Sequence, residues 1–379
     1  MITIGFDAKR ILRNTTGLGS YGRTLVRSLA YQPDTFRLRL YAPDKGREEL
    51  RSQVEGLPRI SLCYPKDSFM PFDKALWRGY GIVRDLKKDR VQIFHGLSGE
   101  LPWGIRRSGI RSVVTIHDLI FLRHPEFYPW IDVKIYAWKF RRTLKEADHV
   151  IAISECTRRD VLELGDIDPS RVSVVYQSCA PRFTKTPTPV NQEQIRLKYG
   201  LPRRFILNVG TIERRKNILL GVQALESLPT ELSLVIVGRH TPYTNQVMEY
   251  VSAHNLSRRV HILHEVPDVD LPALYAQAEA FVYPSVYEGF GIPIIEAVFS
   301  RLPVVACTGS CLEEAGGPDN IYVDPDDAEG MARAIMALLP GSEGREERLR
   351  RSLDYVERFR GVDVARQVVE VYRSIKKNQ

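Results

Sequence analysis

Residues 281–297 have the sequence Phe281-Val282-Tyr283-Pro284-Ser285-Val286-Tyr287-Glu288-Gly289-Phe290-Gly291-Ile292-Pro293-Ile294-Ile295-Glu296-Ala297. The apolar residues 281–283 suit a buried strand, and Pro293 suits the first turn of a helix. Gly289 and Gly291 let the backbone come close to a ligand, and the free N–H groups just before Pro293 favour an anion or a hydroxyl. This stretch therefore predicts a strand, a ligand-binding turn and a helix.

Two carboxylates lie in this stretch. Glu288 belongs to the predicted turn and Glu296 lies about one turn into the helix, so both can accept hydrogen bonds from the vicinal hydroxyls of one ligand, as a sugar or a ribose presents them. The alternative is that Glu288 is a surface loop residue and that Glu296 interacts with the helix dipole.

The same alternation of a short apolar strand and a longer helix-compatible segment runs along the whole chain. Because these strands are apolar on both faces, they predict parallel sheets covered by helices, the doubly wound α/β class. The predicted strands are 2–6, 37–41, 92–95, 112–116 and 149–153, and then 205–210, 232–238, 260–263, 280–284 and 303–306.

A length of 379 residues favours two domains. Residues 180–192 carry three prolines without a hydrophobic period and predict an extended linker. We therefore expect an N-terminal domain over 1–185 and a C-terminal domain over 186–360. Residues 361–379 are expected to form an amphipathic helix that could dock on either domain.

The net charge of +8 is unevenly distributed. Residues 1–185 carry 32 Lys and Arg against 21 Asp and Glu, whereas the remainder carries 22 against 25. The basic half suggests an anionic partner, such as a phosphorylated acceptor, an acidic membrane surface or nucleic acid, and the alternative is a solvated basic surface.

The cysteines and the N-terminal sequence indicate the cellular compartment in which the protein is expected. Five cysteines without a CxxC pair argue against a disulfide framework, and Cys307 and Cys311 are expected to be buried small apolar residues. No signal-like or membrane-spanning segment is seen, so we expect a cytoplasmic protein.

At this point the sequence resembles the family 4 glycosyltransferases of the GT-B fold, whose hallmark is two glutamates eight positions apart around a G-F-G-x-P turn. Residues 209–217 resemble the donor-phosphate loop of that family, and 324–327 resemble its later D-P-x-D turn. The resemblance implies two Rossmann-like domains facing a central cleft. It also implies retaining transfer of a hexose, mannosyl or similar, from a nucleotide-diphosphate sugar to a saccharide or lipid-linked acceptor in cell-surface glycan biosynthesis.

The resemblance also assigns donor-site residues. Glu296 would bind the ribose hydroxyls, Glu288 the transferred sugar, and Arg215 with Lys216 the diphosphate. The donor-binding set that the resemblance implies further contains Gly210, Gly289, Phe290, Gly291 and Ile292. The alternative for residues 214–216 is a solvated run of charges.

The leaving diphosphate must be stabilised by a metal ion or by fixed cations, and Arg215 and Lys216 can supply the latter. No Asp-x-Asp lies where a metal ion would bridge the diphosphate, since Asp324 and Asp326 fit the D-P-x-D turn, in which Asp326 is expected to cap a helix. We therefore expect neither a metal ion nor a cofactor.

In the N-terminal domain, His117 and Asp118 follow a buried strand, at the edge where open α/β sheets bind ligands. By resemblance, His117 contacts the donor sugar, and Asp118 either orients His117 or caps the next turn. His95 also follows a buried strand. His95 and Asp118 are candidates for the acceptor side, and the alternative for His95 is a structural role.

Residues 17–22 form a literal GxGxxG, and Asp44 follows the second strand. Alone they would suggest an NAD(P)-dependent oxidoreductase, but about ten residues separate the first strand from the glycines, which does not fit the dinucleotide fingerprint. The loop instead resembles the glycine loop of the family, in which Gly17 and Gly19 approach the donor diphosphate and Tyr21 opens the first helix.

Residues 130–145 combine basic and aromatic side chains, which fits either a helix at a membrane surface or one whose aromatic residues fill the domain core. We see no nucleic-acid-binding motif. The expected partners are a nucleotide-sugar donor and a saccharide or lipid-linked acceptor, with peripheral membrane contact as a hypothesis. A sugar-nucleotide epimerase of the same fold is the remaining alternative.

Overall fold

The computed structural model describes residues 2–32, 36–65, 71–360 and 363–377, and it divides the chain into two compact units. Unit 1 comprises Met1–Gln177 with Asp363–Gln379, and unit 2 comprises Ser178–Val362. The division falls eight residues before the predicted boundary at 185. Of the predicted third segment, 361–362 and 378–379 lie outside the described residues.

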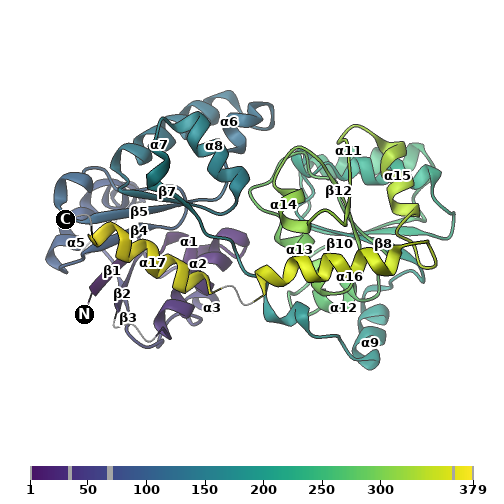
Figure 1. The fold of residues 1–379 in the computed structure, drawn as a ribbon, viewed down its shortest axis with the longest axis horizontal. Coiled ribbons are helices and arrows are strands. Elements are labelled where there is room, and N and C mark those ends of the chain that lie inside the picture. Colours follow the sequence, from purple (N-terminus) through teal and green to yellow (C-terminus); the bar gives the residue numbers. More distant parts are fainter. Residues whose placement is uncertain (1, 33–35, 66–70, 361–362, 378–379) are drawn as a thin grey trace. The chain divides into compact units, whose positions relative to one another are not determined.

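The sheet of unit 1 has, within the described residues, seven parallel strands in the order β3-β2-β1-β4-β5-β6-β7 (Figure 1). The strand order reverses between β1 and β4, as in a Rossmann-like sheet. The strands are β1 (Ile2–Asp7), β2 (Phe36–Tyr41), β3 (Ile60–Cys63), β4 (Ile93–Gly96), β5 (Arg111–Ile116), β6 (His149–Ala152) and β7 (Val172–Val174).

The sheet of unit 2 repeats this topology with six parallel strands in its described part, in the order β10-β9-β8-β11-β12-β13. The order reverses between β8 and β11, which pair at Leu207 and Phe281. The strands are β8 (Phe205–Val209), β9 (Ser233–Val237), β10 (Val260–Leu263), β11 (Phe281–Tyr283), β12 (Val304–Cys307) and β13 (Ile321–Val323). The predicted fold class is confirmed.

Helices cover both faces of each sheet (Figure 1). In unit 1 they are α1 (Lys9–Arg13), α2 (Gly17–Ala30), α3 (Glu48–Arg51), α4 (Pro71–Leu76), α5 (Ile82–Lys88), α6 (Ile120–Arg123), α7 (Trp130–Glu146), α8 (Glu155–Gly165) and α17 (Val364–Lys377). In unit 2 they are α9 (Pro189–Tyr199), α10 (Ile218–Ala224), α11 (Pro242–Ala253), α12 (Leu271–Tyr275), α13 (Ile292–Phe299), α14 (Leu312–Gly316), α15 (Ala328–Met336) and α16 (Arg345–Val356).

One prediction about the chain between the domains is wrong. Residues 180–192 are not an extended linker, because they contain a 3₁₀ turn, Pro181–Thr184, and the start of α9. Phe183 in that turn is 1% exposed and packs edge-to-face on Tyr275, with ring centroids 5.5 Å apart. Two of the three prolines, Pro181 and Pro189, occupy the first turns of these helices, where no intrahelical N–H donor is needed.

The C-terminal helix α17 belongs to unit 1, where it contacts α2. Its apolar face is buried, as the predicted amphipathic pattern requires, and includes Val368 and Tyr372. The Tyr372 hydroxyl and Nδ1 of His95 are 2.7 Å apart, so a segment at the end of the chain completes the core beside β4.

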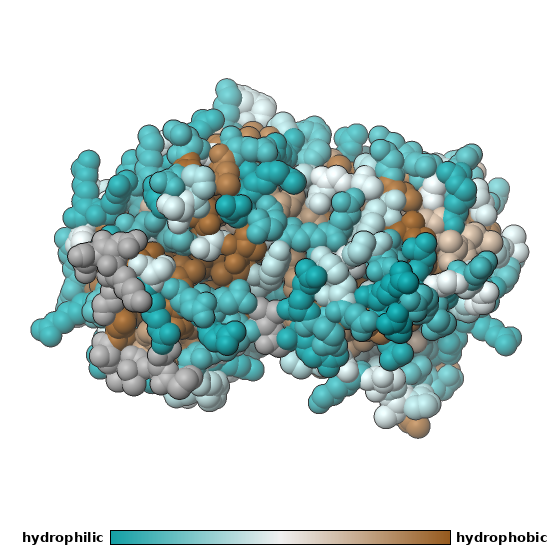
Figure 2. All heavy atoms as spheres, in the orientation of Figure 1, coloured by the Kyte–Doolittle hydropathy of each residue, from teal (hydrophilic) through white to brown (hydrophobic). Residues whose placement is uncertain are grey.

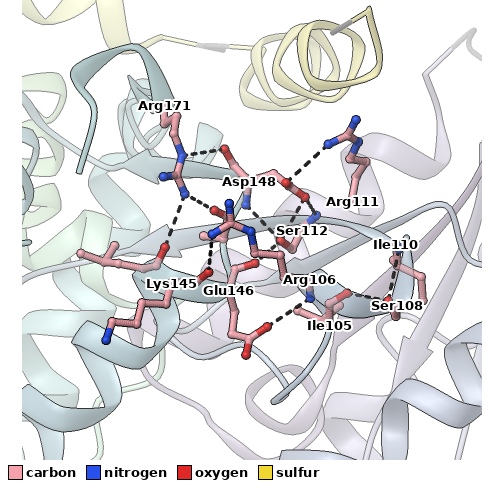
Figure 3. A network of polar contacts seen from close by, with 12 residues as sticks. Ile105, Arg106, Ser108, Ile110, Arg111, Ser112, Lys145, Glu146, Asp148 and Arg171 are labelled. Atoms are coloured by element: carbon pink, nitrogen blue, oxygen red, sulfur yellow. Dashed lines mark hydrogen bonds and ion pairs between the residues drawn. The ribbon is translucent and has the colours of Figure 1, made fainter. Parts of the chain in front are cut away.

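A polar network fixes the end of α7 against the loop that precedes β5 (Figure 3). The buried Glu146 carboxylate accepts hydrogen bonds from the backbone N–H groups of Gly104 and Arg106, both at 3.1 Å. Ser112 donates from its hydroxyl to the Glu146 carbonyl at 2.6 Å and from its N–H to Asp148 at 2.8 Å. This network holds α7 and the 103–106 loop in a fixed relation.

The face seen in Figure 2 is largely hydrophilic, with patches of apolar side chains among the charged ones. Among the described helices, none combines the length and the apolar character needed to span a bilayer.

Candidate active site

The donor-site residues predicted in unit 2 follow two neighbouring strands. Residues 210–217 follow β8 and residues 284–291 follow β11, and these are the two strands between which the strand order reverses. Ligands of open α/β sheets bind outside the carboxyl ends of the strands at this position. The topology therefore brings the two predicted loops to one edge of the sheet.

The loop after β8 ends in a 3₁₀ turn, Arg214–Lys216, followed by Asn217 in the left-handed region at φ 50°. Asparagine adopts this conformation more readily than most residues. Its side-chain amide donates a hydrogen bond to the Pro325 carbonyl at 2.8 Å, so the D-P-x-D turn supports the donor-phosphate loop. The predicted helix cap in that turn is one residue off, because Asp327, not Asp326, caps α15 by accepting from the Gly330 N–H.

Glu288 is surrounded by cationic groups from this loop. Lys216 forms an ion pair with Glu288 and donates to the Tyr283 hydroxyl at 2.7 Å. Nη1 of Arg215 lies 3.0 Å from Glu288 and donates to the Tyr287 carbonyl at 3.0 Å. Burial alone would raise the pKa of Glu288, but Lys216 and Arg215 outweigh it and lower that pKa to about 2. The carboxylate is therefore ionised at neutral pH, and the interpretation as a solvated charge run does not describe Arg215 and Lys216.

The turn after Glu288 is stabilised by hydrogen bonds from a buried cysteine. Cys311, which is fully buried, donates from Sγ to the carbonyls of Phe290 at 2.8 Å and of Glu288 at 3.1 Å. Gly291 has φ 117°, which a side chain would strain, and it precedes α13 as its N-cap. Among the hydrogen bonds of the described residues, none uses the N–H of Gly291 or Ile292. These two groups can donate to an anion or a hydroxyl, as predicted for this turn.

Glu296 is half-buried on α13 and accepts a hydrogen bond from the Tyr275 hydroxyl at 3.2 Å. Burial raises the pKa of Glu296 to about 8, although Arg182 and Tyr275 act in the opposite direction. A carboxyl that is mostly protonated at pH 7 can donate to one hydroxyl while it accepts from another. This arrangement suits vicinal hydroxyls and stays consistent with the predicted ribose contact.

His117 lies at the carboxyl end of β5 in unit 1. Its Nε2 donates to the Leu97 carbonyl at 2.9 Å, which leaves Nδ1 to accept from the Gln177 amide at 3.3 Å. The Tyr21 ring packs edge-to-face on the imidazole at 4.9 Å. Burial lowers the pKa of His117 to about 4, against the effect of the Leu97 hydrogen bond, so the imidazole is neutral at pH 7. Its contact with the donor sugar remains a prediction.

The acceptor-side candidates differ in exposure. His95 is fully buried, its Nε2 lies 2.8 Å from the Thr115 hydroxyl, and burial lowers its pKa to about 3. This environment favours the structural interpretation of His95. Asp118 accepts a hydrogen bond from the Ile120 N–H at 3.3 Å, which is the turn-capping alternative.

The glycine loop does not have dinucleotide-fingerprint geometry, because α1 lies between β1 and the glycines. Helix α2 begins at Gly17, so Tyr21 lies within the helix and the prediction that it opens the helix is wrong. A Cβ at Gly19 would lie 1.9 Å from the Asn14 carbonyl oxygen, whereas a Cβ at Gly17 would meet nothing within 4 Å. Gly19 is therefore required by packing, and Gly17 is not.

Several residues that shape these sites were not predicted, namely Gln177, Tyr275, Tyr283, Cys311 as a hydrogen-bond donor, and Glu213, which accepts a hydrogen bond from Arg215 at 2.5 Å. Tyr283 lies in the quoted strand, at its carboxyl end, and this position could have identified it. Gln177 and Tyr275 carry no local signal, since they reach the sites only through the tertiary structure. Cys307 and Cys311 are buried, as predicted.

Two family models match the chain. Residues 15–178 match "Glycosyltransferase Family 4" and residues 191–352 match "Glycosyl transferases group 1". Among curated proteins, the O-antigen chain mannosyltransferase B of Escherichia coli is 28% identical, over 97% of this chain and 98% of its own length. The O-antigen chain mannosyltransferase RfbU of Salmonella typhimurium is 29% identical over 65% of each chain.

Solved structures show the same fold at low sequence identity. A sucrose-phosphate synthase from Thermosynechococcus elongatus matches with a TM-score of 0.80 and 21% identity over 100% of both chains. A glycosyltransferase from Rickettsia africae matches with a TM-score of 0.77 and 20% identity, over 100% of this chain and 99% of its own.

Proposed function

The chain belongs to the family 4, or group 1, glycosyltransferases, and on this premise we propose that it moves a hexose from a nucleoside diphosphate to a saccharide acceptor with retention of configuration. Mannose is favoured because the two relatives described above are both named O-antigen mannosyltransferases. Their names also favour an acceptor that is a growing cell-surface glycan, free or lipid-linked. The candidate donors are the UDP-, GDP- and ADP-sugars.

The observation that carries this proposal is the group formed by Lys216, Arg215 and Glu288 at the point where the strand order of unit 2 reverses. Two cations fixed at this edge can stabilise the charge that develops on the departing diphosphate. They are the basis for proposing transfer without a divalent metal ion. The Gly291 and Ile292 N–H groups add two donors beside Glu288.

In the proposed reaction, the bond between the anomeric carbon and the diphosphate oxygen breaks while a bond to the acceptor hydroxyl oxygen forms on the same face. The acceptor proton passes to the leaving phosphate oxygen. Arg215 and Lys216 stabilise the negative charge that remains, and Glu288 holds the two cations in position and accepts hydrogen bonds from the sugar hydroxyls.

The experiment that tests the function has two parts. Thermal unfolding is measured with UDP, GDP, ADP, their sugar conjugates and NAD, with and without EDTA, since a ligand at about 100 times its Kd adds about 2.7 kcal/mol to stability. The stabilising sugar nucleotide is then incubated with saccharide acceptors and the products are separated. Stabilisation by NAD alone, or conversion of the donor to an epimer without acceptor, would refute transfer.

We also propose that unit 1 contacts an acidic membrane surface through α7. Phe140 and Leu144 of this helix are core residues, but Trp130 and Trp138 are 67% and 51% exposed. Lys134 is exposed and its ammonium lies 4.6 Å from the centroid of the Trp130 ring. Exposed indole rings beside basic side chains are typical of helices that lie at an interface.

This contact is tested by co-sedimentation with vesicles of phosphatidylglycerol or of phosphatidylcholine. We expect binding to the anionic vesicles that weakens in Trp130→Ala and falls with salt. The matched control is Tyr31→Ala, which removes an aromatic ring that is 66% exposed at the end of α2. Equal loss in both variants, or equal binding to both lipids, would contradict the proposal.

A further inference from the structure

A cavity of about 660 Å³ lies within unit 1 and is not used by the donor-site residues. Its walls come from the segments that follow β1, β2 and β4 and from α4, α5 and α7, together with the turn between α4 and α5. It therefore opens at the carboxyl ends of β1 and β4, where the strand order of this sheet reverses and where open sheets bind ligands.

The cavity has an excess of positive charge. Six basic side chains and three carboxylates line it. The basic residues are Lys9, Arg13, Lys74, Arg78, Lys139 and Arg142, and the acidic residues are Asp7, Asp44 and Glu100. The surplus of three charges would attract an anionic ligand.

Most of these charges hold each other in place. Arg78 donates to Asp7 at 2.5 and 2.9 Å and to Glu100 at 2.5 Å, and Lys139 donates to Glu100 at 3.0 Å. Arg78 lies on a π-helical turn, Trp77–Gly81, a distortion that is frequent at functional sites. Burial alone would raise the pKa of Glu100, but Arg78 and Lys139 lower it to about 2. These groups form a fixed frame around the cavity.

Lys9 is the exception. It is half-buried, and within the described part of the chain no carboxylate forms an ion pair with its ammonium. Burial and the nearby Arg78 lower its pKa, whereas the Glu100 and Asp7 carboxylates raise it. Because both carboxylates are already paired with Arg78, an additional anion at Lys9 would stabilise two neighbouring cations. The ligand that fits this position carries negative charge.

Two indole rings also line the cavity, and the Arg142 guanidinium lies over one of them, 5.4 Å from the centroid of the Trp103 ring. Trp103 and Trp138 pack edge-to-face with ring centroids 5.6 Å apart and are 41% and 51% exposed. The backbone N–H of Trp103 donates to the Gly79 carbonyl at 2.8 Å. The Glu146 network (Figure 3) holds α7 against the loop at Gly104, next to Trp103. Indole faces pack well on the C–H faces of sugar rings. The cavity thus combines charged groups with indole rings that can pack on a sugar.

We propose that this cavity binds the acceptor of the transfer reaction and that the acceptor is a phosphorylated saccharide, with its phosphate at Lys9 and its sugar against Trp103 and Trp138. Because Arg142 also forms an ion pair with Glu146, the remaining surplus of two positive charges matches the roughly two charges of a sugar phosphate better than the single charge of a uronic acid. Binding of a phosphorylated sugar here is a property of unit 1, and its role as the acceptor rests on the proposed function.

The test is calorimetric titration of the full chain with mannose, inorganic phosphate, mannose 1-phosphate and mannosyl farnesyl diphosphate. The wild type is compared with Lys9→Met and with Arg10→Met, which removes an exposed charge from the same helix outside the cavity. We expect Lys9→Met to lower the affinity for the phosphorylated ligands about tenfold or more. Arg10→Met should change these affinities less than about twofold. Trp138→Ala should weaken both mannose-containing phosphates and leave the affinity for inorganic phosphate unchanged.

The outcomes separate the two proposals. Lys216→Met should weaken nucleotide binding about 10- to 100-fold and leave mannose 1-phosphate binding intact, so an equal loss of both would overturn the cavity as a separate site. Equal effects of the Lys9 and Arg10 variants, or equal affinity for mannose and its phosphate, would also overturn it. A preference for the farnesyl ester would identify a lipid-linked source, and equal affinities would identify a soluble one. A chain that binds the phosphates but no nucleotide sugar would refute only the proposed function.

Discussion

Replacement of Lys216 by methionine removes an ammonium group and keeps most of the side-chain volume. That ammonium forms an ion pair with Glu288 and donates to Tyr283, and the two charged side chains are only 16% and 11% exposed. Removing one member of a buried pair costs about 3–5 kcal/mol because the other charge is left unpaired. Arg215 still lies 3.0 Å from Glu288, so we expect a smaller loss, about 2 kcal/mol.

The double variant separates the stability of this group from its binding role. Adding Glu288→Gln removes the stranded carboxylate, so Lys216→Met with Glu288→Gln should recover about 1 kcal/mol of the loss. Affinity for the nucleoside diphosphate should stay about 10- to 100-fold below that of the wild type, since the ammonium is still absent. Chemical denaturation measures the free energy of unfolding, and isothermal titration calorimetry measures the affinity for the nucleoside diphosphate.

Arg214→Met is the matched control, because Arg214 lies on the same turn but is exposed. This variant should change the free energy of unfolding and the affinity for nucleoside diphosphates little. The reasoning is refuted if Lys216→Met binds nucleoside diphosphates as tightly as the wild type, or if the double variant is no more stable than the single one.

Three further predictions concern the acidic residue on α13, the buried thiol and the glycine loop. The pKa of Glu296 is about 8 in the folded chain and about 4.3 in the unfolded chain. Between about pH 4.3 and pH 8, the folded state therefore holds a proton on Glu296 that the unfolded state has lost. Stability should thus fall as pH rises through this window, by at most about 1.4 kcal/mol per pH unit, and Glu296→Gln should flatten the profile of thermal midpoint against pH. Cys311→Ala removes the thiol that donates to two buried carbonyls, so it should lower the free energy of unfolding by about 1–3 kcal/mol and raise the KM for the sugar nucleotide. Cys311→Ser keeps a hydrogen-bond donor and should behave closer to the wild type in the same assays. Gly19→Ala should lower the thermal midpoint by several degrees, because its Cβ would collide with the Asn14 carbonyl, and Gly17→Ala should not; a similar midpoint for both variants would contradict the packing argument.

The central strands could be predicted from the sequence to within about one residue at each end. β1, β5 and β8 are apolar on both faces because helices cover both faces of their sheets, so their sequences carry the signal themselves. The strands β3, β7 and β13 were not among the predicted ones. They lie at sheet edges and are only partly buried, so their sequences are less apolar.

The donor-site motif could also be recognised from the sequence, but the contacts around it could not. The sequence placed Glu288 and Lys216 on loops at the carboxyl edge of one sheet. It did not show that Tyr283 and Cys311 hold the charged groups and the turn in position. These contacts depend on the packing of side chains, which leaves no periodic pattern in the sequence.

The sequence by itself determined the fold class, the family and the loops that carry the donor site, because apolar periodicity, glycines and paired charges are local properties. Only the tertiary structure placed Lys9 near Arg78 in a cavity that two indole rings also line, and only it joined His95 to Tyr372, 277 residues further along the chain. The physical reason is that a cavity or a buried contact forms between segments that are distant in sequence, and its energy depends on their distances and burial rather than on either segment alone.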